Sequence, residues 1–272
     1  MSVLEVNLLG VPEVRSDGTL LKVPAGKTLA LLAYLAVEGG MHPREEVVAL
    51  LWPDVGEQEA RACLRTALTV LRKALSIRSE KPEVLRTVSN AIGLEPAATE
   101  VDVHVLETAA ALARQREATP GLRVQLERAV AAARGPLLTG VSLADAPDFA
   151  TWLLVRREAS HRRLAEVLAH LASLHEATGD LPTAITTLEQ WVRHDPLEEQ
   201  AHSRLIAAHA ATGDSAAGLR AYEECRTVMG TELGIEPSLE IQALAEQLQS
   251  ATRRLACHPM RHSSTAEFLT EP

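Results

Sequence analysis

Residues 57–75, EQEARACLRTALTVLRKAL, form the stretch on which the expected fold of the N-terminal half depends. At about 100° per residue, the corresponding helix has an apolar stripe that consists of Ala60, Leu64, Leu68, Leu71 and Leu75. A second stripe, roughly 90° away, consists of Arg61, Arg65, Thr69 and Arg72, with Thr66 and Lys73 on its flanks. The pattern predicts a helix with one face in a core and with guanidinium and hydroxyl groups facing outward.

The chemistry of the second stripe suits nucleic acid. A guanidinium fork fits guanine edges and phosphates, and a threonine fits a phosphate or the methyl group of thymine. Taken alone, the segment favours an ordinary amphipathic helix with a solvated basic face. The surrounding sequence reverses that preference.

The net charge of −9 is unevenly distributed along the chain. Residues 1–99 carry 11 Lys and Arg against 12 Asp and Glu, whereas residues 100–272 carry 16 against 24. Within residues 61–86, seven basic side chains face two acidic ones, a net charge of +5. A local positive patch is sufficient to attract phosphates, so the acidic total does not exclude a nucleic-acid partner.

Length and composition indicate two largely helical domains in a protein of the bacterial cytoplasm. Arginine outnumbers lysine by 23 to 4, as is typical of proteins from GC-rich bacterial genomes. A chain of 272 residues is long enough for two cores, and seven aromatic residues leave Ala, Leu and Val to build them. The three cysteines, Cys63, Cys225 and Cys257, are far apart and predict reduced thiols. No signal peptide is recognised, and the longest apolar run, residues 29–37, is too short to span a bilayer.

The order of elements in residues 1–98 predicts a winged helix-turn-helix with a small N-terminal β-sheet. Turn residues divide residues 3–24 into three short strands, and an apolar helix follows over residues 27–38. A second helix opens at His42-Pro43 and runs to Trp52, and the basic helix is the third. Residues 84–88 and 92–94 then read as a hairpin.

The terminal hairpin is the expected wing. In a winged helix the third helix enters the major groove and the wing lies along the backbone or in the minor groove. Arg86, Thr87 and Asn90 are therefore candidate DNA contacts, although ordinary hairpin polarity explains them equally well.

The strings LALLAYLAVEGGMHPREEVVALLWPD (residues 29–54) and ARACLRTALTVLRKAL (residues 60–75) resemble the DNA-binding domain of the Streptomyces antibiotic regulatory protein (SARP) family. The resemblance implies a winged helix of the OmpR type. In that type the connection between the second and third helices contacts RNA polymerase, which implies this role for Asp54 and Glu57. Their carboxylates would be repelled by phosphates, so we expect this loop to face away from DNA. The alternative for Glu57 is stabilisation of the helix dipole.

The C-terminal half predicts an α-helical solenoid of the tetratricopeptide type. Helices are expected over residues 101–115, 121–134 and 147–178. The string ATGD at residues 177–180 recurs at residues 211–214, a spacing of 34 residues. This is the tetratricopeptide period, in which each repeat is one helix pair and the core forms only by stacking.

Motifs in this half are similar to the SARP family's bacterial transcriptional activation domain. They are GPLLTG at residues 135–140, DPLE at residues 195–198 and ELGIEP at residues 232–237. The expected division is a DNA-binding domain at residues 1–98, an activation domain at residues 99–252 and a disordered tail at residues 253–272.

Three patterns that suggest other chemistry fail on their own spacing. Residues 25–28, AGKT, end like a phosphate-binding loop, but Leu21 stands where that loop needs a glycine. His170 and His175 lie on different faces of a helix, and Pro259 opposes a helical site between His258 and His262. We therefore predict no metal site, no cofactor, no catalytic site and no enzyme.

The leading hypothesis, as the resemblance implies, is a homodimeric transcriptional activator that acts at the nucleoid. It would bind double-stranded promoter DNA and recruit RNA polymerase, with a biosynthetic gene cluster as a candidate target. The alternative is a tetratricopeptide-type interaction scaffold whose winged helix does not bind DNA.

Overall fold

The structure is a computed structural model that describes residues 3–75, 84–115 and 121–256. The N-terminal strands are β1 (Leu4–Asn7), β2 (Glu13–Ser16) and β3 (Thr19–Leu21), which pair as antiparallel hairpins as predicted. A fourth strand, β7 (Thr99–Val101), was not predicted and pairs parallel to β1. The sheet order is β3-β2-β1-β7. Strand β1 therefore pairs with β2 on one edge and, on the other edge, with a strand that lies more than 90 residues later in the chain.

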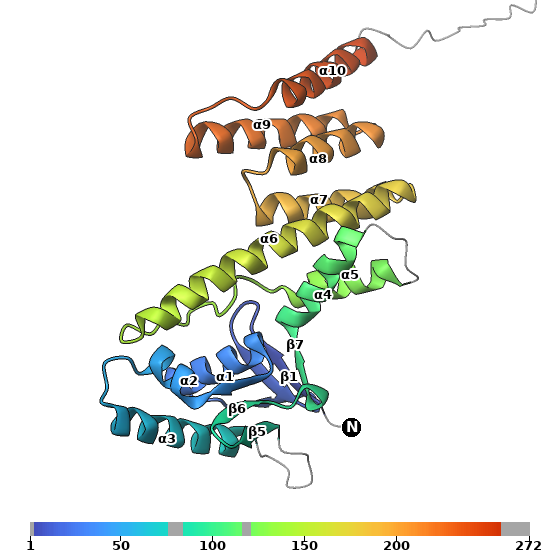
Figure 1. The fold of residues 1–272 in the computed structure, drawn as a ribbon. Coiled ribbons are helices and arrows are strands. Elements are labelled where there is room, and N and C mark those ends of the chain that lie inside the picture. The colour runs from blue at the N-terminus through green and yellow to red at the C-terminus, as the bar shows by residue number, and fades with distance from the viewer. Residues whose placement is uncertain (1–2, 76–83, 116–120, 257–272) are drawn as a thin grey trace, which may run out of the picture. The chain divides into compact units, whose positions relative to one another are not determined.

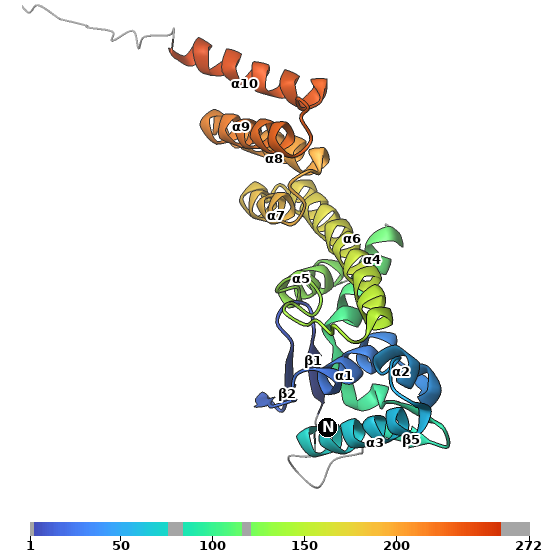
Figure 2. The ribbon, with the colours of Figure 1, turned by 90° about the vertical axis from the view of Figure 1, so that its left-hand side faces the viewer.

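The winged helix follows with three helices and a second sheet. The helices are α1 (Lys27–Glu38), α2 (Arg44–Leu51) and α3 (Glu57–Leu75), and α3 runs below α1 and α2 in both views (Figures 1 and 2). Strands β5 (Leu85–Val88) and β6 (Ala91–Leu94) form the expected hairpin. These elements confirm the predicted fold class.

The second helix begins two residues later than predicted because His42 and Pro43 belong to a strand. Residues Met41–Pro43 form β4, which pairs with β6 in a sheet of order β4-β6-β5. The close approach of the two strands needs a glycine, since a Cβ on Gly93 would lie 2.1 Å from the carbonyl oxygen of Gly40.

The apolar stripe of α3 packs into the core as its periodicity predicted. The buried side chains of this helix are Ala60, Leu64, Ala67, Leu68 and Leu71. Leu75, the last residue of the predicted stripe, is only partly buried at the helix end. Helix α1 supplies the opposing surface, because every residue from Ala30 to Val37 is buried. The polar stripe of α3 is thereby fixed outward.

The chain divides into two compact units at Leu171. The first contains the winged helix, α4 (Asp102–Gln115), α5 (Leu122–Ala132) and most of α6 (Pro147–Ala177). The second begins within α6 and contains α7 (Leu181–His194), α8 (Glu199–Ala211), α9 (Ser215–Glu232) and α10 (Leu239–Ala256). That residues 1–98 bind DNA and fold as a separate domain stays a prediction.

The second unit is the predicted helical repeat. The two ATGD strings lie at the turns before α7 and α9, where Gly179 and Gly213 have φ of 75° and 79°. The following aspartates cap the next helix, since Asp180 accepts from the Thr183 N–H and Asp214 from the Ala217 N–H. Figure 1 shows the resulting helices stacked in chain order. Helix α10 extends four residues into the predicted tail, and residues 257–272 lie outside the described residues.

The leading sheet is tied to α4 by a buried carboxylate. Asp102 Oδ2 accepts hydrogen bonds from the N–H groups of Leu8 and Leu9, both at 2.7 Å, and Oδ1 accepts one from Val103 at 2.8 Å. Burial raises the pKa of Asp102, and the three N–H donors and Arg134 oppose that shift. The carboxylate thus satisfies donors at the end of β1 and at the start of α4 together.

The GPLLTG motif, residues 135–140, closes the same corner. Leu138 N–H donates to the carbonyl of Leu8 at 2.8 Å, and Gly10 N–H donates to that of Pro136 at 3.0 Å. Arg157 on α6 then donates to the carbonyls of Leu137 and Leu138. The motif therefore joins the first sheet to α6 through backbone groups.

Helix α6 is also attached to the winged helix itself. Glu38, at the end of α1, accepts from the indole N–H of Trp152 and from the guanidinium of Arg156. Burial raises the pKa of Glu38, but these two donors outweigh it and the pKa lies below its usual value. Tyr34 packs edge-on against Trp152, with ring centroids 5.5 Å apart. This contact orients the winged helix within the first unit.

Replacing Asp102 with Ala is expected to lower the free energy of unfolding by about 3 kcal/mol, because three buried N–H groups lose their acceptor. Asp102→Asn, which keeps one carbonyl oxygen, should fall between Ala and wild type. Urea titration of the intact protein measures this. The matched control is Asp148→Ala, an exposed residue in the first turn of α6, which should change stability by less than about 1 kcal/mol. Equal losses for the two alanine variants would contradict the assigned role.

Candidate nucleic-acid interface

The outward stripe of α3 carries the candidate DNA contacts. Arg61, Arg65, Thr66, Thr69 and Lys73 are exposed, and Arg72 is partly buried. Their ion pairs and hydrogen bonds differ, however, and these decide which charges are available to a phosphate.

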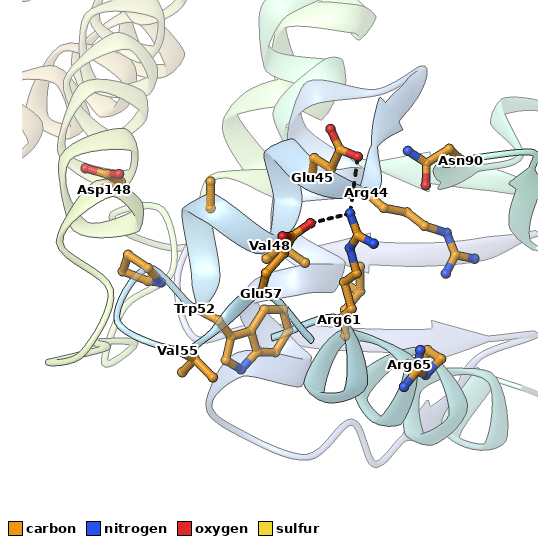
Figure 3. Close-up of a pocket in the computed structure, with 13 residues that line it drawn as sticks. Arg44, Glu45, Val48, Trp52, Val55, Glu57, Arg61, Arg65, Asn90 and Asp148 are labelled. Atoms are coloured by element: carbon orange, nitrogen blue, oxygen red, sulfur yellow. Dashed lines mark ion pairs between the residues drawn. The ribbon is translucent and has the colours of Figure 1, made fainter. Parts of the chain in front are cut away.

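Arg61 is held by carboxylates. Its Nη2 lies 2.6 Å from Glu57 Oε1, one turn earlier on α3, and 3.6 Å from Glu45 Oε1 on α2 (Figure 3). All three side chains are more than half exposed, so the pairing is weak and can open. Until it opens, Arg61 brings little net positive charge to the surface.

Arg65 and Lys73 are the unpaired cations of this face. The side chain of neither residue makes a hydrogen bond or an ion pair with another of the residues that the structure describes. Because their charges are not neutralised by neighbouring carboxylates, they contribute most to the local positive potential.

The wing is joined to α3 by Arg72. Its Nη2 donates to the Thr87 hydroxyl of β5 at 2.7 Å. Arg86, the preceding residue of β5, pairs instead with Glu95 at 3.3 Å. The structure therefore brings Arg72 and Thr87 together as predicted for one surface, while part of the charge of Arg86 is neutralised.

The two threonines of α3 have their hydroxyl donors occupied. Thr66 donates to the carbonyl of Ala62 at 3.1 Å, and Thr69 donates to that of Arg65 at 2.9 Å. Such bonds to the preceding turn are common for threonine in helices. The hydroxyl oxygens can still accept and the methyl groups can contact thymine, but donation to a phosphate would first require rotation.

Arg44, at the start of α2, is a basic residue that the sequence reasoning missed. It borders an open hollow of ≈ 800 Å³ together with Arg61, Arg65 and Asn90 (Figure 3). Its backbone N–H donates to the Asn90 carbonyl at 2.8 Å, and its Nε is buried without a hydrogen-bond partner in the described part of the chain. A cation at a helix N-terminus opposes the helix dipole, and this signal in the sequence could have singled out Arg44.

The two predicted polymerase contacts lie in different surroundings. Asp54 is exposed in the loop between α2 and α3 and has no hydrogen bond or ion pair with another described residue. It therefore does not cap α3. Glu57 pairs with Arg61, so its carboxylate lies beside the candidate DNA-binding face rather than away from it as expected.

The described ranges contain neither a metal-binding cluster nor a membrane-spanning helix. Within residues 3–75, 84–115 and 121–256, no cluster of three or more His, Cys, Asp or Glu could hold a metal ion. Across those same ranges, no helix has the length and hydropathy needed to cross a membrane.

The fold and the basic helix with its wing define a winged-helix protein with a helical repeat domain. The model of the family described as bacterial transcriptional activator domain matches residues 101–249, more than half of the chain. The chain belongs to this family, which confirms the relationship to SARP regulators expected from its motifs.

Curated relatives extend this similarity over nearly the whole chain. The transcriptional regulatory protein EmbR of Mycobacterium tuberculosis is 26% identical over 257 residues, 90% of this chain and 63% of EmbR. The regulatory protein AfsR of Streptomyces coelicolor is 28% identical over 278 residues, 99% of this chain and 26% of AfsR. The chain thus spans less than two thirds of EmbR and about a quarter of AfsR.

A solved structure shares the fold. The structure of Mycobacterium tuberculosis EmbR in complex with a low affinity phosphopeptide superposes with a TM-score of 0.64 at 24% sequence identity. The match covers 92% of this chain and 66% of that chain.

Proposed function

We propose that the protein is a transcriptional activator that binds double-stranded promoter DNA through α3 and the β5–β6 wing and recruits RNA polymerase. The observation that carries the proposal is the two-sided character of α3. Its apolar stripe is buried against α1, and the outward polar stripe with its flank presents the unpaired cations Arg65 and Lys73 on the helix whose Arg72 contacts the wing. Family membership and the regulators EmbR and AfsR support it. The proposal includes a homodimer acting at the nucleoid.

The ion pairs rank the basic residues. Each unpaired cation that contacts a phosphate releases about one counterion from DNA, whereas Arg61 must first leave Glu57. Arg65→Ala and Lys73→Ala should each flatten the slope of log affinity against log salt by about 0.9, and Arg61→Ala should flatten it less. Fluorescence anisotropy measures this, with the duplex upstream of the protein's own gene, between 50 and 200 mM salt. A flat salt dependence of the wild-type protein would remove the DNA-binding proposal.

Opening the Arg61 pair should strengthen DNA binding. Glu57→Gln removes one negative charge and releases Arg61, so we expect affinity to rise by about two- to fivefold, in keeping with the strength of an exposed pair. Glu59→Gln is the matched control. It removes the same charge two residues further along α3, and the Glu59 side chain makes no ion pair with a described residue. Equal gains for both variants would show a general charge effect and no specific role for the pair.

Asp54 separates DNA binding from activation. Asp54→Ala should leave DNA affinity within a few-fold and stability nearly unchanged, because Asp54 does not cap α3. It should lower transcription in a purified polymerase assay at saturating protein, with Glu59→Ala as the control. Glu57 does not suit this test because its loss also releases Arg61. Unchanged transcription would remove Asp54 from the polymerase contact.

The scaffold alternative draws on the groove of the second unit. A hollow of ≈ 330 Å³ between α7, α8 and α9 is bordered by Arg193, Arg220, Glu189 and Glu224. Peptide binding there without any gel shift on DNA would favour the scaffold.

A further inference from the structure

The connection between α9 and α10 exposes three large aliphatic side chains within seven residues. Leu233 is 52% exposed, Ile235 is 50% exposed and Leu239 is 82% exposed. Among residues 231–240, only Pro237 is buried. Single exposed aliphatic residues are ordinary on protein surfaces, but a local group of them marks a contact site.

Hydrogen bonds hold the backbone of the segment that carries these exposed side chains. The N–H groups of Leu233 and Ile235 donate to the Met229 carbonyl at 3.0 and 3.4 Å. Ser238 N–H donates to Glu199 Oε2 on α8 at 3.3 Å, and the Gln242 side chain donates to the Pro237 carbonyl at 2.7 Å. The backbone is thus held from both neighbouring helices and from α8 while the aliphatic side chains face outward.

The segment that carries these side chains is acidic, and the basic residue that directly precedes it, Arg226, is paired with Glu223 at 2.7 Å. Residues 227–250 contain Glu232, Glu236, Glu240 and Glu246 and no Lys or Arg, and all four glutamates are exposed. DNA phosphates and anionic lipids would be repelled. A second copy meeting the same face would oppose like charges, since a two-fold contact places identical patches together. The complementary partner is a basic protein surface with an apolar pocket.

We infer that Leu233, Ile235 and Leu239, with Glu232, Glu236 and Glu240, form an acidic–apolar surface that docks onto a basic, apolar-pocketed surface of RNA polymerase. The inference rests on the proposed function, because an activator has to contact polymerase. The surface also lies inside residues 101–249, the part of the chain that matches the transcriptional activator domain. It is distinct in sequence and chemistry from the Asp54 loop, so it adds a contact to the one proposed there.

The two kinds of side chain have separable effects. The aliphatic residues lose water contact only in the complex, so they set the dissociation rate. The glutamates lie around them in the exposed segment and attract the basic partner at a distance, so they set the association rate and its salt dependence. Removing either group should therefore leave a different kinetic signature.

The test measures binding of the intact protein to purified bacterial RNA polymerase holoenzyme by biolayer interferometry. Ile235→Ser combined with Leu239→Ser should weaken affinity by about tenfold or more, mainly through faster dissociation. The matched control is Leu154→Ser combined with Val155→Ser on α6, where the side chains are 67% and 61% exposed. The control should bind as wild type does. Glu236→Gln combined with Glu240→Gln should slow association and reduce its salt dependence, and it tests the surface even if the serine variant does not fold.

Each outcome separates this inference from the proposed function. Normal DNA affinity with weakened polymerase binding and lower transcription supports the inference. Unchanged polymerase binding in both the serine and the glutamine variants overturns it while leaving DNA binding intact. Loss of self-association in mass photometry, with polymerase binding unchanged, overturns it in favour of a second copy of the chain. A wild-type protein that binds neither DNA nor polymerase overturns the proposed function itself.

Discussion

The carboxylate of Asp102 accepts hydrogen bonds from Leu8, Leu9 and Val103, and the first unit is arranged around this contact. It joins the end of the first strand to the start of α4, and it lies directly after β7, the strand that pairs with β1. The GPLLTG segment and Arg157 then connect the same corner to α6. A buried carboxylate with several N–H partners is costly to disrupt, so it fixes the path of the chain between winged helix and helical domain.

The packing of α3 on α1 gives the first unit an exposed basic face, although the protein has a net charge of −9. Burial of the apolar stripe of α3 against α1 leaves Arg65 and Lys73 outward, while acidic side chains surround Arg61. Phosphate attraction is a local effect over about one Debye length, roughly 8 Å at physiological salt, so the charges of α3 and the wing matter more than the total. The same reasoning applies with opposite sign to residues 227–250, whose glutamates suit a basic partner.

Local patterns in the sequence predicted the local structure well. Helices α1 and α3 have the expected bounds, and the 34-residue repeat lies at the predicted turns because glycine allows a positive φ there and aspartate caps the next helix. Non-local pairing was missed. Strands β4 and β7 have three residues each, and only their distant partners define them. The pairing of Glu45 with Arg61 was missed for the same reason, because it joins two helices. The pairing of Glu57 with Arg61 is local, at i and i+4 of α3, and the sequence could have predicted it. The winged-helix class could thus be predicted, whereas the arginine contacts between separate elements could not.

The central claim is that the outer face of α3 contacts DNA, and site-specific photo-crosslinking tests it most directly. A photoreactive amino acid in place of Thr69, an exposed residue in the middle of the polar stripe, should crosslink to the duplex upstream of the protein's own gene. The same amino acid in place of Val124, an exposed residue of α5, should not. Crosslinking at both positions, or at Val124 alone, would contradict the account, as would the absence of any crosslink at Thr69 under conditions in which the duplex is bound.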